Sequence, residues 1–259
     1  MAMDRSTVGI GVVIGLEAHK LARGTVVRVA TAAALVLVMA TTVGGYAAAM
    51  HAGDTDLGRK AASMVTSPGW DGYTALGVTS VSVTMLLAVG VVMSWSTGRE
   101  FVDGTVVGLF AIPPPLGIIA AAKMAVVLTW ATILGAVEAG ALTTAGLLLG
   151  LGPKGAAGCY TALMLVAALL SASVLPVMWA ATRWRGYLAG IGLTLVILVV
   201  ANLAAGFGLG SYVPWSIPIV WASHQTEVST PLLATPVMTA AIGAWVTLRS
   251  WDRLQLGTD

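Results

Sequence analysis

The sequence predicts an all-α, polytopic membrane protein with six transmembrane helices. Of its 259 residues, 58% are hydrophobic and only 9% are charged, whereas soluble domains carry about 25% charged residues on average. Most of the surface must therefore face lipid instead of water. The aromatic residues also indicate a membrane protein. The chain has nine Trp and three Phe, and Trp is favoured at lipid–water interfaces.

The N-terminal segment Thr7–Arg23 has the pattern of a helix that lies in the membrane interface. Val12 and Leu16 are four residues apart, and the charged residues Glu17 and Lys20 follow them. A helix with an apolar stripe and a charged end suits the headgroup region of a bilayer. We therefore expect an N-terminal interfacial helix that leads into the first span.

Six segments have the length and hydropathy of membrane-spanning helices, each of which needs roughly 20 apolar residues. Together they fill most of the chain, and we expect residues 1–259 to form a single transmembrane domain. The six segments are Thr25–Met50, Tyr73–Trp95, Met124–Leu151, Cys159–Thr182, Tyr187–Leu209 and Pro231–Leu248.

The Lys and Arg residues are distributed unevenly over the two sides of this topology. Of the thirteen, only Arg59, Lys60 and Lys154 lie on one side, and the other ten lie on the opposite side. Cytoplasmic loops carry an excess of Lys and Arg. We therefore predict a multi-pass protein of the cell (plasma) membrane with both termini in the cytoplasm.

Two further apolar stretches are unsuited to spanning. Gly104–Ala122 is interrupted by three consecutive prolines, and Ser211–Gln225 is short and contains two prolines. Each proline removes a backbone donor, and irregular backbone at membrane depth must be covered by protein. For Ser211–Gln225 we expect short outer re-entrant helices, or a pair of short helices at the outer surface, before the last span.

The stretch 98–123 begins where the second span leaves the membrane. A helix here would expose the charged residues Arg99, Glu100 and Asp103 on one side. It would rest Phe101 and Leu109 on the membrane. The prolines would then end it, and Lys123 would mark the return to the membrane. Ordinary loops rarely keep so many apolar residues on the surface. We therefore expect this stretch to contact either lipid headgroups or another protein.

The sequence lacks the motifs of several function classes. It has no P-loop, so a separate subunit would have to bind ATP, and no nucleophile–base pair or paired carboxylates for catalysis. A net charge of +2 without a basic run argues against nucleic acid. The single cysteine, Cys159, suits a small apolar position, and the three histidines are too scattered for a metal site.

Glu138 is the only charged residue well inside a predicted span. A charged side chain at the bilayer centre costs about 2.5–3.5 kcal/mol on insertion scales, so Glu138 should face the protein interior or be protonated. Two interpretations stay open. Glu138 lines a substrate or proton path with polar neighbours such as Thr132, or it makes an interhelical hydrogen bond.

Four short motifs lie next to the ends of the predicted spans. They are EAHKLAR (Glu17–Arg23) before the first span, EFVDGT (Glu100–Thr105) after the second, Ala122–Lys123 before the third, and PWSIP (Pro214–Pro218) before the last. Taken in order, the chain resembles the ABC-2 type transporter permeases over most of its length. The resemblance is to the short six-span subunits associated with bacteriocin, lantibiotic or bacitracin self-protection.

The resemblance implies that the segment after the second span is a coupling helix, which docks on a cytoplasmic P-loop ATP-binding subunit. The residues carried over are Glu100, Gly104 and Thr105, beside the apolar side chains of Phe101 and Leu109. Many relatives place a basic residue just after the proline turn. This chain has none at 114–117, so the contact is expected to rely on the apolar face.

The resemblance also implies that Glu17 and Lys20 support this contact and that Trp215 and Trp221 cap the pathway. Two permease chains, alike or different, would pair with two subunits that bind ATP and Mg. The assembly would export an apolar or amphiphilic compound such as an antibiotic, peptide or lipid. The alternatives are a secondary transporter or channel that uses Glu138, and a non-transporting membrane scaffold.

Overall fold

The computed structural model of the protein describes residues 10–51, 55–65, 67–111, 113–223 and 228–255. Within these ranges every regular element is a helix. Six helices or runs of helices are long and apolar enough to cross a membrane, which confirms the all-α, six-span prediction. They are Thr25–His51, Gly69–Val102, Leu116–Leu148, Ala156–Arg183, Tyr187–Gly206 and Thr230–Asp252.

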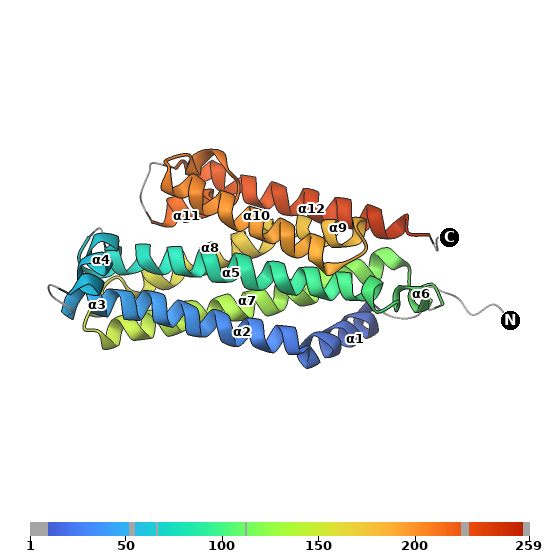
Figure 1. The fold of residues 1–259 in the computed structure, drawn as a ribbon, viewed down its shortest axis with the longest axis horizontal. Helices are drawn as coiled ribbons and strands as arrows, with labels where there is room; N and C mark the ends of the chain where they lie inside the picture. Colours follow the sequence, from blue (N-terminus) through green and yellow to red (C-terminus); the bar gives the residue numbers. More distant parts are fainter. Residues whose placement is uncertain (1–9, 52–54, 66, 112, 224–227, 256–259) are drawn as a thin grey trace.

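The helices form an elongated bundle (Figure 1). The first span combines α2, the π-helical segment η1 and α3, and the fourth combines α8 and α9. In chain order the elements are α1 Ile10–Arg23, α2 Thr25–Val38, η1 Met39–Gly44, α3 Gly45–His51, α4 Asp56–Met64, α5 Gly69–Val102, α6 Val106–Leu109, α7 Leu116–Leu148, α8 Ala156–Ser173, α9 Pro176–Arg183, α10 Tyr187–Gly206, η2 Gly210–Tyr212, α11 Ile217–Ala222, η3 Thr230–Leu233 and α12 Ala234–Asp252.

Helix α5 is the element on which the bundle is built. It packs against α2, α7, α8, α9 and α10, and Met85 and Met93 on it are fully buried. Glycines let neighbouring helices approach closely, as small residues do in membrane bundles. A Cβ atom at Gly90 of α5 would lie only 2.3 Å from Cγ2 of Thr194 on α10. The backbone of α5 at Gly90 therefore packs directly against the Thr194 side chain of α10.

The two ends of the bundle differ (Figure 1). Helices α1 and α6 and the last turns of α12 lie at one end, which we call the α6 end, and α3, α4 and α11 lie at the other, the α11 end. At the α6 end, Lys20 and Arg23 close α1, and Arg249 lies in the last turn of α12. Both described chain ends thus lie on the same side of the bundle, as an even number of spans requires.

The fourth span is broken between α8 and α9. Pro176, the first residue of α9, has no N–H with which to continue the hydrogen bonding of α8. The carbonyl of Ser173 at the end of α8 instead accepts a hydrogen bond from Nε1 of Trp215, at 3.0 Å. Gly243 of α12 faces the break, since a Cβ atom there would lie 2.6 Å from the Pro176 ring. The break is therefore enclosed by protein on two sides.

Helix α1 covers most of the predicted N-terminal helix, whose residues 7–9 lie outside the described ranges. It packs on α7. Val13 and Glu17 face the bundle and are buried, whereas Val12 and Leu16 are exposed. The exposed apolar side chains suit contact with lipid, and the position of α1 in the membrane interface stays a prediction.

Short helices also occur where the sequence predicted them before the last span. They are η2, α11 and η3, and α11 packs against α8 and α5. Residues 224 and 225, the end of the predicted stretch, lie outside the described ranges. The depth of these helices in the bilayer stays a prediction.

Helix α7 begins at Leu116, not at Met124 as we expected for the third span. Pro115 is the N-cap of α7, so the helix starts directly after the last of the three prolines. Lys123 consequently lies two turns inside α7 and is only 2% exposed. Its charge is neutralised inside the bundle by Glu17 and Glu100, and the point at which the chain returns to the membrane stays a prediction.

Candidate functional site

Four charged side chains from three helices meet near the α6 end of the bundle. They are Glu17 and Lys20 of α1, Glu100 of α5 and Lys123 of α7, and we refer to them as the charge cluster. Two lysines face two glutamates, so the charges of the cluster balance. Residues separated by more than 100 positions in the sequence are joined in this way.

Lys123 is the centre of the charge cluster. Its Nζ atom donates hydrogen bonds to Oε2 of Glu17 and Oε1 of Glu100, both at 2.7 Å, and to the carbonyl of Ser96 at 3.3 Å. Glu100 is 3% exposed and Glu17 is also buried. Removing charges from water is costly unless each finds partners of good geometry, and here each buried charge does.

Lys20 closes the cluster on its solvent side, with 38% of its side chain exposed. Its Nζ atom lies 2.8 Å from Oε1 of Glu17 and 3.3 Å from Oε1 of Glu100. Partial burial by itself lowers the pKa of Lys20. The hydrogen bond and negative charge of Glu17, together with Glu100, outweigh this and raise the pKa above its usual value of 10.5. Lys20 is therefore a stable cation at neutral pH.

The turn after α5 is attached directly to the charge cluster. Oγ1 of Thr105 donates a hydrogen bond to Oε2 of Glu100, at 2.6 Å. Gly104, just before it, has a φ of +68°, in the left-handed region that glycine adopts without steric cost. Glycine at 104 and threonine at 105 therefore bend the chain back so that α6 starts against Glu100.

Helix α6 is only one turn long, shorter than the coupling helix that we expected. Val107 and Phe110 are exposed on this segment, whereas Leu109 is buried. Residue 112, which belongs to the stretch 98–123 that the sequence analysis singled out, lies outside the described ranges. The exposed apolar side chains form a small surface beside the charge cluster, which we call the α6 surface.

One expectation about this stretch was wrong. Glu100 does not expose its charge, because α5 continues to Val102 and turns the carboxylate towards Lys123. Phe101 is half-buried and makes an edge-to-face contact with Trp251 of α12, with ring centroids 6.3 Å apart, and its contact with the membrane stays a prediction. Glu100 and Phe101 therefore fix the end of α5 to other helices.

The residues predicted to line or cap a pathway lie in different parts of the bundle and do not line a common cavity among the described residues. Glu138 is fully buried, and Oγ1 of Thr84 on α5 donates to its Oε2 atom at 3.4 Å. Thr132 is exposed and donates to a carbonyl of its own helix. Trp215 and Trp221 are half-buried near α11. The contact of Glu138 with Thr84 is the interhelical hydrogen bond that the sequence left open as one of two interpretations.

Lys123 is the site residue that sequence reasoning omitted. The sequence singled it out as a marker of the third span and, with Ala122, as one motif of the family resemblance, but gave it no role in the site. A buried cation in an apolar helix requires a carboxylate partner, and the two glutamates at the ends of neighbouring elements were the available signal. Using that signal required knowing that α7 starts at Leu116.

These features define a multi-pass, α-helical membrane protein whose spans are joined by a buried ion-pair network at one end. The family model described as ABC-2 family transporter protein matches residues 13–201. The chain belongs to this family of membrane transport components, as the resemblance predicted. The match extends from α1 into α10 and includes all four residues of the charge cluster. A comparison with curated proteins finds no significant match.

Proposed function

We propose that this chain is the membrane-spanning permease subunit of an ATP-driven exporter, oriented with the α6 end in the cytoplasm. The observation that carries the proposal is the attachment of the turn before α6 to the charge cluster. Thr105 is bonded to Glu100, Glu100 to Lys123, and Lys123 to Glu17. A displacement of α6 is thereby passed to α5, α7 and α1 together.

The partner at the α6 surface is a cytoplasmic P-loop subunit, which binds ATP and Mg. Val107 and Phe110 offer it an exposed apolar contact, and residues at the centre of protein contacts are typically apolar or aromatic. ATP binding in that subunit would move α6 and tilt the attached spans. A second permease chain, the same or different, completes the transport pathway.

The cargo is an apolar or amphiphilic compound such as an antibiotic, a peptide or a lipid. Support comes from the described spans, whose outward surfaces are aliphatic. Exposed examples are Val36 on α2, Ile133 on α7 and Val199 on α10. A pathway formed between two such chains would be apolar along its walls.

Copurification tests this proposal. A tagged chain extracted from its native membranes is expected to bring down a P-loop ATPase. The Val107→Glu variant is expected to lose that ATPase, because a charge replaces an apolar contact on the α6 surface. Met64→Glu, at an exposed position of α4 at the α11 end, should retain it. A chain that recruits no P-loop protein, or loses it equally in both variants, contradicts the proposal.

A secondary transporter or channel is the second candidate, and one observation favours it. Oε1 of Glu138 is buried and has no hydrogen-bond partner among the described residues, so this carboxyl group has capacity for a proton or an ion. An ABC permease does not need such a group, and Glu138 then only joins α7 to α5.

Replacing Glu138 by glutamine separates the two candidates. In an ABC permease, Glu138→Gln keeps an acceptor for Thr84, so transport should be unchanged and stability should shift by no more than about 1 kcal/mol. The measurement compares uptake of the transported compound into proteoliposomes that contain the wild-type or the Glu138→Gln protein, with and without an ion gradient. Loss of gradient-driven transport in a folded Glu138→Gln protein would favour the second candidate.

A further inference from the structure

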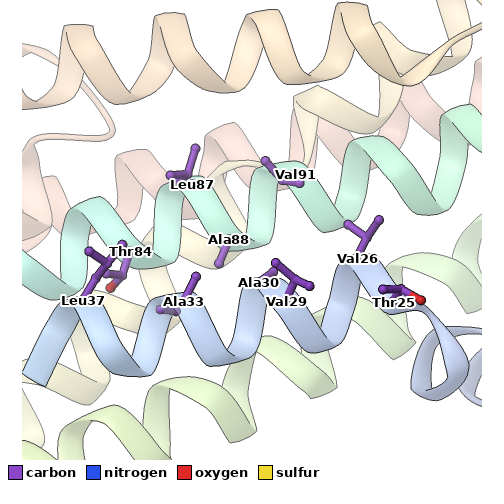
Figure 2. A pocket seen from close by; sticks show the side chains of 11 residues that line it. Thr25, Val26, Val29, Ala30, Ala33, Leu37, Thr84, Leu87, Ala88 and Val91 are labelled. Carbon is purple, nitrogen blue, oxygen red and sulfur yellow. The ribbon is translucent and has the colours of Figure 1, made fainter.

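A groove of about 380 Å³ runs between α2 and α5 on the outer surface of the bundle (Figure 2). Val29 and Leu37 on its α2 side are 61% and 47% exposed, so the groove opens to the surroundings of the bundle. Small side chains hollow it out, and Thr25 and Thr84 are its polar residues. The lining residues are Thr25, Val26, Val29, Ala30, Ala33, Ala34, Leu37, Thr84, Leu87, Ala88 and Val91.

The length of the groove matches one leaflet of a bilayer. From Thr25 to Leu37, α2 advances about 18 Å at roughly 1.5 Å per residue. One half of a hydrocarbon core is about 15 Å thick. The groove starts at Thr25, next to α1 at the α6 end, and Leu37 and Thr84 lie together at its other end (Figure 2). It therefore follows the direction and the length of an acyl chain.

A cation lies beyond the α6 end of the groove. Trp95 and Arg99 continue the α5 face of Val91 at spacings of four residues, and the Arg99 guanidinium lies 4.5 Å from the centre of the Trp95 ring. A Cβ atom at Gly24 would lie 2.5 Å from that ring, so the indole fills the bend between α1 and α2. The apolar groove thus ends at an aromatic ring with a positive charge above it.

Arg99 lies beside the charge cluster and lines a small pocket with Glu17, Lys20 and Lys123. The neighbouring carboxylates, Glu100 and Glu17, are paired with Lys123 and Lys20. No ion pair joins Arg99 to any part of the chain that the structure describes. Guanidinium groups bind phosphate well through their paired N–H donors. An anionic headgroup is the complement to this end of the groove.

We propose that the groove is a binding site for an anionic membrane phospholipid of the leaflet at the α6 end. One acyl chain lies between α2 and α5, and the phosphate group binds Arg99. The site is a property of this chain in the bilayer and does not depend on the ATPase partner. A second copy of the chain is the competing occupant of the same groove.

Lipid-dependent stabilisation tests the site on the purified chain. The thermal unfolding midpoint in detergent is measured while phosphatidylglycerol, or phosphatidylcholine with the same acyl chains, is added. A ligand that binds the folded state raises this midpoint, and at a fixed ligand concentration a tighter ligand raises it more. We expect the wild-type chain to bind phosphatidylglycerol more tightly than phosphatidylcholine.

Two matched pairs of variants locate the lipid. Ala33→Phe fills the groove and should abolish the lipid-dependent shift, whereas Ala32→Phe, at an exposed α2 position outside the lining, should preserve it. Arg99→Gln should weaken phosphatidylglycerol binding about tenfold. Arg249→Gln removes an arginine that lies near Trp245 of α12 and should leave binding unchanged. Equal effects within either pair would overturn the proposal.

Cysteine crosslinking tests the competing occupant. In a Cys159→Ala background, Val29→Cys places the only thiol of the chain at the exposed edge of the groove. Efficient disulfide-linked dimers in native membranes would mean that a second copy occupies the groove and would overturn the lipid site. Absence of such dimers, with the lipid shift intact, supports it. Neither assay measures binding of an ATPase, so failure of the lipid site and failure of the copurification test can be told apart.

Discussion

Replacing Lys123 by methionine is expected to destabilise the folded protein by about 3–5 kcal/mol, the range found when one partner of a buried ion pair is removed. The variant would leave the carboxylates of Glu17 and Glu100 close together, with only the partly exposed Lys20 as a cation. Unfolding of the purified protein in detergent, by heat or by dodecyl sulfate, measures the loss.

Lys154→Met is the matched control for this prediction. Lys154 is exposed in the connection between α7 and α8, and its replacement should change stability by less than about 0.5 kcal/mol. Adding Glu17→Gln to Lys123→Met should restore part of the loss, because one buried negative charge is removed with its partner. A Lys123→Met protein as stable as the Lys154→Met control would contradict the role of the charge cluster.

Gly98→Ala is expected to separate α5 from the start of α10. A Cβ atom at position 98 would lie 2.2 Å from the backbone nitrogen of Tyr187 and 2.4 Å from its Cα atom. Overpacking of a core typically costs about 1–3 kcal/mol. We expect the upper part of that range, because the obstructing atoms belong to the backbone and cannot rotate away. Yield of folded protein and its unfolding midpoint both measure the effect.

The control for Gly98→Ala is Gly192→Ala on α10. A Cβ atom at Gly192 meets nothing within 4 Å, and alanine is a better helix former than glycine by about 1 kcal/mol. Gly192→Ala should therefore be neutral or slightly stabilising. If both variants lose stability equally, the close contact of α5 with α10 is not what makes Gly98 necessary.

The spans were predictable because apolar runs are long and continuous in this sequence. The start of α7 was not, because a charged residue usually marks the edge of a span. Lys123 lies two turns inside α7 instead of before it, where two glutamates from other helices neutralise its charge. Such pairing joins residues far apart in sequence and leaves no periodic pattern. The same applies to Phe101, whose partner Trp251 lies on the last helix.

The residues of the candidate site were predicted in part, and their arrangement was not predicted. The family resemblance singled out Glu17, Lys20, Glu100 and Thr105, and the structure brings these four together. The resemblance treated them as docking residues, whereas the carboxylates are buried and bind lysines. Our proposal therefore assigns docking to exposed apolar residues such as Val107, which sequence reasoning did not name. Their contact with an ATPase stays a prediction.

Crosslinking from the α6 surface tests the central claim most directly. In the Cys159→Ala background, Val107→Cys would carry the only thiol of the chain, and Met64→Cys on α4 would carry it at the opposite end of the bundle. A bifunctional reagent should join Val107→Cys, but not Met64→Cys, to a copurified P-loop ATPase in intact membranes. Crosslinks from Met64→Cys alone, or from neither position in an active complex, would contradict docking at the α6 surface.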